Sequence, residues 1–398
     1  MMEVSFRLKS MAESETLAMS QKSAELKKRG VDVINLSVGE PDFFTPNHVK
    51  QAAKDAVDAN FSFYSPVPGY LSLRKAICDK LQRENGLTYT PDQIVCSNGA
   101  KQALCNVLLA TLNPDDEVII PAPYWVSYVE MVKLADATSV VIPAGIEQDF
   151  KITPQQLQAA ITVRTKAIIL CSPSNPTGSV YSREELAALV DILAKCPNIL
   201  VISDEIYEHI NYIGRHESIA QFPELKDRVA IINGVSKGYA MTGWRLGWLA
   251  APTWLAKACV KLQGQYTSCP SSIAQKAAEA AYLGDQSCVV TMREAFDRRR
   301  RLVVDLVRDI PGLKVNNPMG AFYVFPECKS FFGKTTPDGH VIANASDLVM
   351  YLLEVGHVAC VGGAAFGAPE CIRMSYATSD EKLVEAFARI KNSLAQLQ

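Results

Sequence analysis

Short apolar runs alternate with stretches of helical periodicity between about Asp92 and Leu249, and this alternation constrains the fold more than any other feature. Each run is almost continuously apolar, as expected for a strand buried on both faces, and the intervening segments have the apolar spacing of amphipathic helices. The runs cover residues 118–120, 167–171, 199–203, 229–232 and 246–250. The pattern predicts an α/β domain with a mostly parallel sheet covered by helices on both sides.

Polar residues of specific kinds follow three of these runs. The sequence after one run is SPSNPTG (172–178), after the next SDEIY (203–207), and after the third NGVSK (233–237). Ligands collect at the carboxyl ends of strands in such sheets, so these residues are the first candidates for a binding site.

Lys237 lies shortly after the end of an apolar strand, and Arg245 follows it eight residues later among small residues. An amine that attacks an aldehyde must be unprotonated near neutral pH, and desolvation beside a second cation lowers the pKa of a lysine. The pair suits a phosphorylated aldehyde cofactor held as a Schiff base. The alternative is a solvated lysine after a strand, since most lysines are exposed; the order of the surrounding residues favours the cofactor.

A second candidate for phosphate binding precedes the segment 102–112, whose apolar positions follow helical spacing. Gly99, Ala100 and Lys101 would lie at the amino terminus of that helix. Free backbone N–H groups and the helix dipole favour an anion there.

Length and composition describe a cytosolic globular protein with two lobes. The chain has 398 residues, of which 48% are hydrophobic and 21% charged, and a net charge of -2. This charge does not favour nucleic acid. The eleven cysteines lie in apolar runs without C-x-x-C spacing, which indicates reduced thiols in the cytoplasm. No signal-peptide pattern or run of membrane-spanning length is present, so no membrane partner is expected, and no metal site is predicted.

After Asp285 the pattern changes to a charged helix over 292–308, the segment GAFYVF at 320–325, an alternating strand at 371–376 and a terminal amphipathic helix. These elements predict a smaller α+β lobe that the amino-terminal segment joins. The four arginines at 298–301 are interpreted as a solvated helix face rather than a polyanion site.

Taken together, these motifs resemble the class I aminotransferases, fold type I enzymes that use pyridoxal 5'-phosphate. The resemblance is closest to the branch of bacterial aspartate aminotransferases that also contains prephenate aminotransferases, and it extends from NLSVGEPD at 35–42 to RMSY at 373–376. It implies a large domain, 46–290, with a mostly parallel seven-stranded sheet, and a small domain made of 1–45 and 291–398. It also implies a homodimer with shared active sites.

The resemblance assigns each cofactor contact to a residue. Lys237 forms the Schiff base and shuttles the proton, Asp204 pairs with the protonated pyridine nitrogen, Asn175 and Tyr207 donate to O3', and Trp125 stacks on the ring. The implied phosphate contacts are the N–H groups of Gly99 and Ala100 with Lys101 beside them, Ser236, Arg245, and Tyr64 of the partner subunit. Relatives often have serine where this chain has Gly234, so one phosphate hydrogen bond is expected to be missing.

For the substrate, the resemblance implies that Arg373 binds the α-carboxylate, with Asn175, Trp125 and the Gly39 backbone alongside. From the residues alone, an internal salt bridge to an acidic residue is the alternative for Arg373. Segment 263–270 contains no arginine for a second carboxylate, and Lys101 is implied in that role. A lysine turned to solvent is its alternative.

The implied reaction transfers the amino group of L-aspartate to 2-oxoglutarate by a ping-pong mechanism, with prephenate as a further acceptor. Three alternatives stay open: an aminotransferase of alanine or aromatic specificity, a carbon–sulfur lyase, and, remotely, the aminotransferase-like domain of a transcription factor. The last needs a DNA-binding region, and only about 30 residues precede Val31. The resemblance further predicts cis peptide bonds before Pro123 and Pro176, and a looser loop at 361–363.

Overall fold

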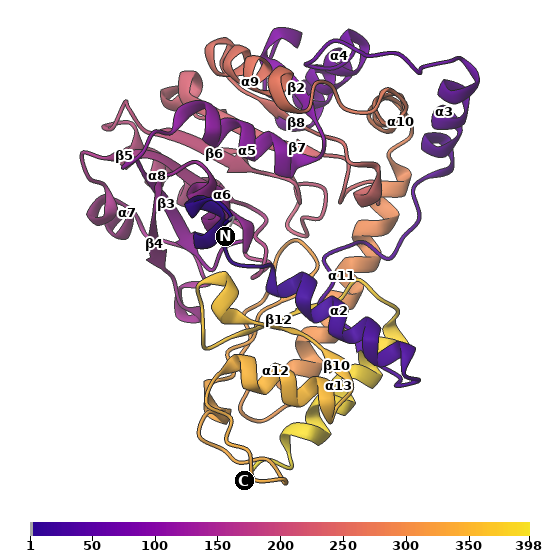
Figure 1. Cartoon of the computed structure of the whole chain (residues 1–398), viewed down its shortest axis with the longest axis vertical. Helices are drawn as coiled ribbons and strands as arrows, with labels where there is room; N and C mark the ends of the chain where they lie inside the picture. Colours follow the sequence, from indigo (N-terminus) through magenta and orange to yellow (C-terminus); the bar gives the residue numbers. More distant parts are fainter. Residues whose placement is uncertain (1–2) are drawn as a thin grey trace.

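The predicted seven-stranded sheet is present in the computed structural model, which describes residues 3–398 (Figure 1). Its strands, in spatial order, are β2 (Ile94–Ser97), β8 (Gly247–Ala250), β7 (Val229–Gly234), β6 (Leu200–Asp204), β5 (Thr165–Cys171), β3 (Glu117–Ala122) and β4 (Thr138–Pro143). All neighbours are parallel except that β8 runs antiparallel to both β2 and β7. The sheet is therefore mostly parallel, as the apolar runs predict.

Helices cover both faces of this sheet because alternate residues of each strand point in opposite directions. On β5, Ile168 and Leu170 join one core cluster, whereas Ala167 and Ile169 join the other. The first face is covered by α3 (Asn47–Asp58), α4 (Leu71–Lys80), α7 (Pro154–Ala160), α8 (Arg183–Leu193) and α10 (Ser272–Leu283). The second is covered by α5 (Ala100–Thr111), α6 (Ser127–Leu134) and α9 (Thr253–Tyr266). Both faces are thus buried.

The lower part of the molecule in Figure 1 has its own core and two small sheets. In one sheet β1 (Ile34–Asn35) pairs with β10 (Val358–Ala359), and the other has the order β11 (Val361–Gly362), β12 (Ile372–Ser375), β9 (Tyr323–Val324). The surrounding helices are α2 (Glu15–Lys28), α11 (Ser287–Arg308), α12 (Ala345–Glu354) and α13 (Asp380–Leu394). This arrangement is the α+β lobe expected from the sequence.

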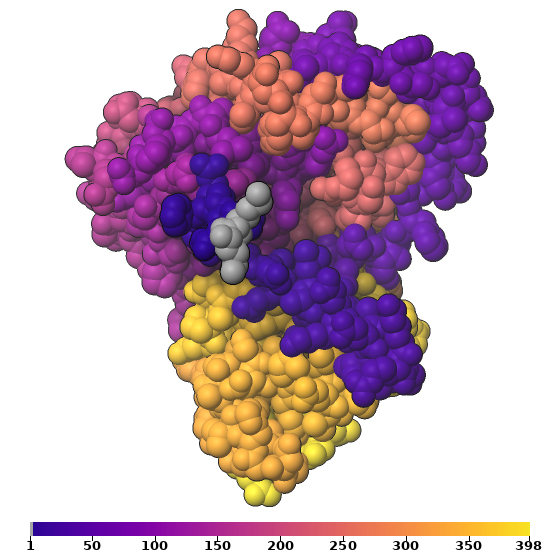
Figure 2. All heavy atoms as spheres, in the orientation of Figure 1, coloured from indigo at the N-terminus to yellow at the C-terminus, as the bar shows by residue number. Residues whose placement is uncertain are grey.

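The amino-terminal segment crosses from one part to the other, as the space-filling view shows (Figure 2). Its short first helix, α1 (Phe6–Ser10), packs on α6, where Arg7 forms an ion pair with Asp136. The following helix, α2, packs on β10 and β11.

We propose that the domain division lies at the expected boundaries, with 46–290 as the large domain and 1–45 and 291–398 as the small one. The cores support the division, since Val289 belongs to the large core and Met292, one turn later on α11, to the small one. The attachment of α1 to α6 is the exception, because it ties the first residues of the small domain to the large one.

Two expectations about the small domain are wrong. Arg299 is not solvated: it is 8% exposed and pairs with Asp42 at 2.7 Å and Asp380 at 3.3 Å, because α11 turns this face toward the core. The segment 361–363 is not loose either. The Gly363 N–H donates to Cys371 O at 2.7 Å, and a side chain at Gly363 would collide with two backbone carbonyls.

No helix among residues 3–398 combines the length and apolar character needed to cross a membrane. All eleven cysteines are free thiols.

Candidate active site

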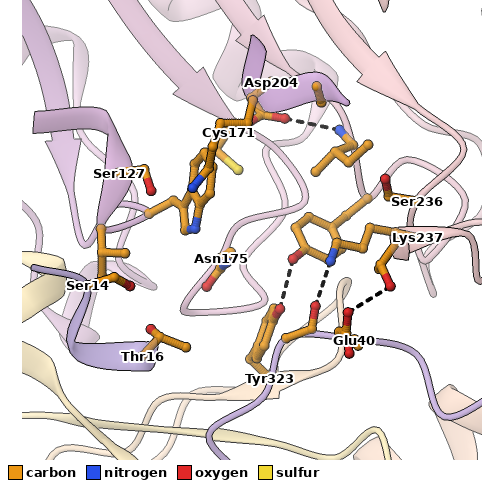
Figure 3. Close-up of a pocket in the computed structure, with 18 of the residues that line it drawn as sticks. Ser14, Thr16, Glu40, Ser127, Cys171, Asn175, Asp204, Ser236, Lys237 and Tyr323 are labelled. Carbon is orange, nitrogen blue, oxygen red and sulfur yellow. Dashed lines mark hydrogen bonds between the residues drawn. The ribbon is translucent and has the colours of Figure 1, made fainter. Parts of the chain in front are cut away.

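A cavity of about 500 Å³ opens at the carboxyl ends of β5, β6 and β7, where the small domain meets the sheet (Figure 3). Cys171 ends β5, Asp204 ends β6, and Lys237 follows β7; Arg373 reaches the same cavity from β12. The structure thus brings Cys171 and Arg373, which are 202 positions apart in the sequence, into one cavity.

Lys237 points into this cavity from a largely enclosed position. Its Nζ donates to the Gly39 carbonyl at 2.6 Å and lies 5.9 Å from the centre of the Tyr207 ring. Burial is the main cause that lowers the pKa of Lys237 to about 8; the nearby guanidinium groups act in the same direction, whereas Glu40 opposes them. The amine therefore loses its proton far more readily than an ordinary lysine, as the sequence predicts.

Asp204 faces the cavity from the buried end of β6. One carboxylate oxygen accepts a hydrogen bond from the Tyr128 hydroxyl at 2.6 Å, and the other accepts from the Ile206 N–H at 3.2 Å. Burial raises the pKa of Asp204 to about 6, and these hydrogen bonds oppose that rise. Asp204 remains largely ionised at neutral pH, with space for a cation beside it.

Sequence reasoning missed Tyr128, which lies one helical turn beyond Trp125 on α6 and contacts its ring edge-on, with centroids 5.5 Å apart. No motif marks this tyrosine. Its role depends on how α6 packs on this face of the sheet, where the helix contacts β3 and β4, and the sequence does not reveal that packing.

Arg373 is the most deeply buried cation of the cavity, at 2% exposure. Its guanidinium donates to Asn175 Oδ1 at 3.0 Å and to Ser37 O at 2.7 Å, and lies between the rings of Tyr323 and Phe366. Its Nε has no partner, and no carboxylate within residues 3–398 pairs with it. The internal salt bridge considered from the sequence is therefore wrong, and the charge is available to a ligand anion.

Tyr207 also lines the cavity, and its hydroxyl lies 2.8 Å from the Tyr323 hydroxyl. Burial raises the pKa of Tyr207 well above the usual tyrosine value, so the group stays a neutral hydrogen-bond donor.

A cradle suited to an anion lies at the start of α5. Gly99 caps the helix with φ +83°, and any side chain there would collide with the Arg245 guanidinium, which lies against it. The Gly99 N–H donates to Ser97 O at 2.8 Å, so the free donors lie one residue later than expected, at Ala100 and Lys101. Gly234 packs directly on the Gly247 backbone, which leaves no room for a serine side chain at this position.

The rim of the cavity contains both predicted and unexpected residues. The Lys101 ammonium lies 4.8 Å from the centre of the Trp125 ring, and desolvation followed by the Arg245 charge lowers the pKa of Lys101. Ser14, Thr16 and Leu17, at the start of α2, also line the cavity. No sequence motif indicated that α2 would reach the site. Tyr64 does not line this cavity and is 91% exposed.

The predicted cis peptide bonds are confirmed at Ala122–Pro123 and Asn175–Pro176, and a third, not predicted, occurs at Ser172–Pro173.

Comparison with known proteins identifies the class to which this fold and site belong. The profile of the family described as aminotransferase class I and II matches residues 31–390, and the chain belongs to that family. It is 51% identical to the aspartate/prephenate aminotransferase of Cereibacter sphaeroides over 386 residues, 96% of each chain.

Solved structures agree with this assignment. An aspartate aminotransferase from Rhizobium meliloti superposes with a TM-score of 0.97 at 45% identity, covering both chains completely. The aspartate aminotransferase from Thermus thermophilus with maleate gives a TM-score of 0.92 at 39% identity, covering 99% of this chain and 100% of that one. The chain is an aminotransferase, and its cofactor is pyridoxal 5'-phosphate.

The residues present fit that cofactor. Arg245 and the free N–H groups at the start of α5 suit a phosphate, the buried Asp204 carboxylate suits a protonated ring nitrogen, and the Lys237 amine suits an aldehyde carbon.

We expect Tyr128→Phe to weaken cofactor binding most strongly on the acid side. The Tyr128 hydrogen bond lowers the pKa of Asp204, so its loss raises that pKa and reduces the ionised fraction at any given pH below neutrality. Loss of one charge-assisted hydrogen bond predicts an affinity about tenfold lower at pH 6. Spectroscopic titration with pyridoxal 5'-phosphate from pH 5 to pH 8, roughly the span in which a shifted carboxylate changes charge, measures this. If cofactor affinity below neutral pH is the same in the variant as in the wild-type protein, the role assigned to Tyr128 is contradicted.

Proposed function

We propose that this protein transfers the amino group of L-aspartate to 2-oxoglutarate by a ping-pong mechanism and also accepts prephenate. The observation that carries the proposal is the charge of the cavity. Its lining contains four cationic side chains, Lys101, Lys237, Arg245 and Arg373, but only two carboxylates, Glu40 and Asp204. This excess of positive charge suits a phosphorylated cofactor together with a substrate that carries two carboxylates.

The proposed roles of the cofactor-binding residues follow from their positions. Pyridoxal 5'-phosphate, when bound, supplies a ring that accepts the electron pair released when a substrate loses its Cα proton. Asp204 holds a proton at the ring nitrogen, and Asn175 and Tyr207 donate toward the ring oxygen O3'. Trp125 would pack on the ring, and the Lys237 amine would move the proton between the substrate Cα and the cofactor carbon C4'.

The proposed phosphate contacts are the N–H groups at the start of α5, at Ala100 and Lys101, together with Ser236 and Arg245. Gly99 shapes this corner, since its lack of a side chain lets the Arg245 guanidinium approach.

Arg373 is proposed to bind the α-carboxylate of the substrate, close to the Gly39 backbone and to Asn175. Lys101, at the rim, is proposed to bind the second carboxylate of aspartate, 2-oxoglutarate or prephenate. The Thermus thermophilus relative was solved with maleate, a dicarboxylate, and the Cereibacter sphaeroides relative carries both aspartate and prephenate in its name, which supports this substrate class.

Lys101→Ala is expected to raise the KM for aspartate and for 2-oxoglutarate about tenfold, because one ion pair to the second carboxylate is lost. The KM for alanine, which has no second carboxylate, should change less than about twofold. Steady-state kinetics with the two donors measures the difference. Lys101→Arg keeps the charge and is the matched control. Equal losses for aspartate and alanine would contradict the specificity role.

A panel of amino acids, with detection of both oxo acid and ammonia, tests the whole proposal against its alternatives. Aspartate should give oxaloacetate without ammonia. Preference for alanine or an aromatic donor, or release of pyruvate and ammonia from a sulfur-containing amino acid, would replace the proposed reaction by another aminotransferase or by a lyase.

We also propose a homodimer with shared sites in the cytoplasm. Phe44, Phe63 and Tyr64 are 92%, 82% and 91% exposed, which is unusual for large aromatic side chains and supports their burial against a second copy. In that dimer Tyr64 would contact the cofactor phosphate in the partner's site. The free thiols support a reducing compartment.

A further inference from the structure

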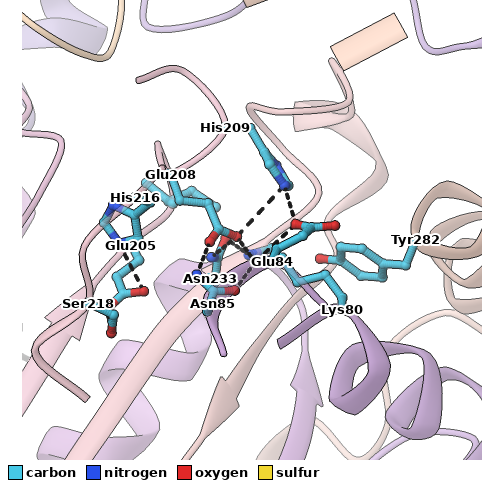
Figure 4. A network of polar contacts seen from close by, with 12 residues as sticks. Lys80, Glu84, Asn85, Glu205, Glu208, His209, His216, Ser218, Asn233 and Tyr282 are labelled. Carbon is cyan, nitrogen blue, oxygen red and sulfur yellow. Dashed lines mark hydrogen bonds and ion pairs between the residues drawn. The ribbon is translucent and has the colours of Figure 1, made fainter. Parts of the chain in front are cut away.

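A second group of polar side chains, shown in Figure 4, does not line the cavity but lies close in the chain to Tyr207 and to the segment that carries Lys237. We call it the rear network; its members are Lys80, Glu84, Asn85, Glu208, His209 and Asn233. Lys80 ends α4, and Glu84 and Asn85 belong to the π-helical turn Leu81–Asn85 that follows it. Turns of this kind occur often at functional sites.

Lys80 and Glu208 form the centre of the rear network, and both are almost fully buried. The Glu208 carboxylate accepts from the Lys80 ammonium, from Asn233 Nδ2 at 2.7 Å and from Asn85 Nδ2 at 2.9 Å. Lys80 also donates to Asn85 Oδ1 at 2.8 Å and lies 3.5 Å from Glu84. Every charge in this centre is therefore met by an opposite charge or a dipole.

The rear network is not a metal site, although Glu84, Glu208 and His209 lie close enough together to hold an ion. The Lys80 ammonium contacts both carboxylates and already supplies the cation between them. Its attraction holds the pKa of Glu208 far below the usual value despite burial.

Two chain segments of the active site are fixed by contacts with the rear network. Glu208 directly follows Tyr207, so its three hydrogen bonds hold the end of that loop. Asn233 donates to Glu208 and accepts from the Gly234 N–H at 2.7 Å, at the start of the segment that carries Lys237.

His209 makes the second contact with the lysine segment. Its ring is bonded to Glu84 at 3.0 Å and lies directly against Gly238, where any side chain would collide with it. The ring also packs edge-on against Tyr239, with centroids 5.5 Å apart. The residues on both sides of Lys237 thus rest on one buried network.

We propose that the buried Lys80–Glu208 pair is a positioning element for the reaction, which holds the Tyr207 loop and the Lys237 segment at their mutual distance. The inference rests on the proposed role of Lys237. The hydrogen bonds of Glu208, the hydrogen bond between Asn233 and Gly234, and the contacts of His209 with Glu84 and Gly238 join both loops to this pair of charges. Buried pairs resist change because the loss of one partner leaves an uncompensated charge. Small displacements of catalytic groups cost up to about 100-fold in rate.

Glu208→Gln tests the proposal, with Glu117→Gln as the matched control. Glu117 is also a buried carboxylate that bonds an arginine and a threonine, Arg164 and Thr162, but it begins β3 at the sheet edge opposite the cavity. The measurements are kcat and KM for aspartate, the thermal unfolding of each protein, and the pKa of Lys237 in the cofactor-free protein. That pKa is read from the pH dependence of acylation at Lys237, followed by mass spectrometry.

Glu208→Gln is expected to lower kcat about 10- to 100-fold with little change in KM. It should also raise the pKa of Lys237 toward the ordinary lysine value, because a loosened segment gains water. The other groups that set this pKa, Glu40, Asp204, Arg245 and Arg373, stay in place. Glu117→Gln should lower stability without either effect.

If the single variant fails to fold, the double variant Lys80→Met/Glu208→Gln provides the test, because it removes both charges of the buried pair and leaves Glu84 bonded to His209. It is expected to be more stable than Glu208→Gln and still slow. Wild-type kcat and an unchanged Lys237 pKa in a folded network variant would overturn the positioning role. A wild-type protein that gains no pyridoxyl mass at Lys237 after borohydride reduction would instead contradict the proposed function.

Discussion

Replacing Lys237 by alanine is expected to lower turnover with aspartate by at least about 10³-fold, the largest effect of any single substitution in this protein. The amine is the cavity group whose pKa, about 8, allows it to give and take a proton near neutral pH. In the proposed roles of Lys237, its loss removes both the anchor for the aldehyde carbon and the base that acts at Cα. Single-turnover mixing of the variant with aspartate, followed by absorbance of the bound cofactor, measures the change.

Lys237→Arg is the matched control, because a guanidinium keeps the positive charge but does not lose its proton. It should be as slow as the alanine variant. In the wild-type protein, uptake of the cofactor should slow as the pH falls below about 8, since burial lowers the pKa of Lys237 to that value and only the neutral amine reacts. An alanine variant that retains turnover within tenfold of wild type would show that another group carries the chemistry.

Arg373→Met is expected to lower kcat/KM for aspartate about 100- to 1000-fold. The guanidinium can offer two charge-assisted hydrogen bonds to a carboxylate, each worth about 1.5 to 3 kcal/mol. Desolvation already lowers the pKa of Arg373, and no carboxylate in residues 3–398 offsets its buried charge. The free energy of unfolding should therefore not fall when the charge is removed, and should rise if methionine packs between Tyr323 and Phe366.

Chemical denaturation of the Arg373→Met protein, measured beside its kinetics, separates substrate binding from folding. Arg373→Lys retains the charge without the planar fork and should fall between wild type and Arg373→Met. A variant that loses stability in proportion to its activity would indicate that Arg373 is structural.

The sheet and the ends of its strands could be predicted because their signals are local. The runs around Ile168 and Ile202 are apolar over several consecutive residues, which only a strand buried on two faces requires. Asp204 follows such a run directly and Lys237 comes five residues after the end of the next one, so their place at the same edge of the sheet follows from parallel pairing.

Residues that reach the site through tertiary packing could not be predicted. Tyr128 bonds Asp204 only because α6 packs on the sheet face over β3 and β4. Thr16 lines the cavity only because α2 packs on β10 and β11 of the small domain. Lys80 and Glu208 are 128 positions apart, and neither is apolar. Arg299 looked like part of a solvated run since four charges in sequence give no sign of which one a helix turns inward.

Helix α11 has a consequence for how the whole chain melts. Its 22 residues span about 33 Å as one continuous rod, with Val289 embedded in the upper core and Val303 and Val307 in the lower. Because the helix is continuous between the two hydrophobic cores, unfolding of one of its ends also exposes apolar residues of the other core. Heat or denaturant should therefore dismantle both masses in a single cooperative transition.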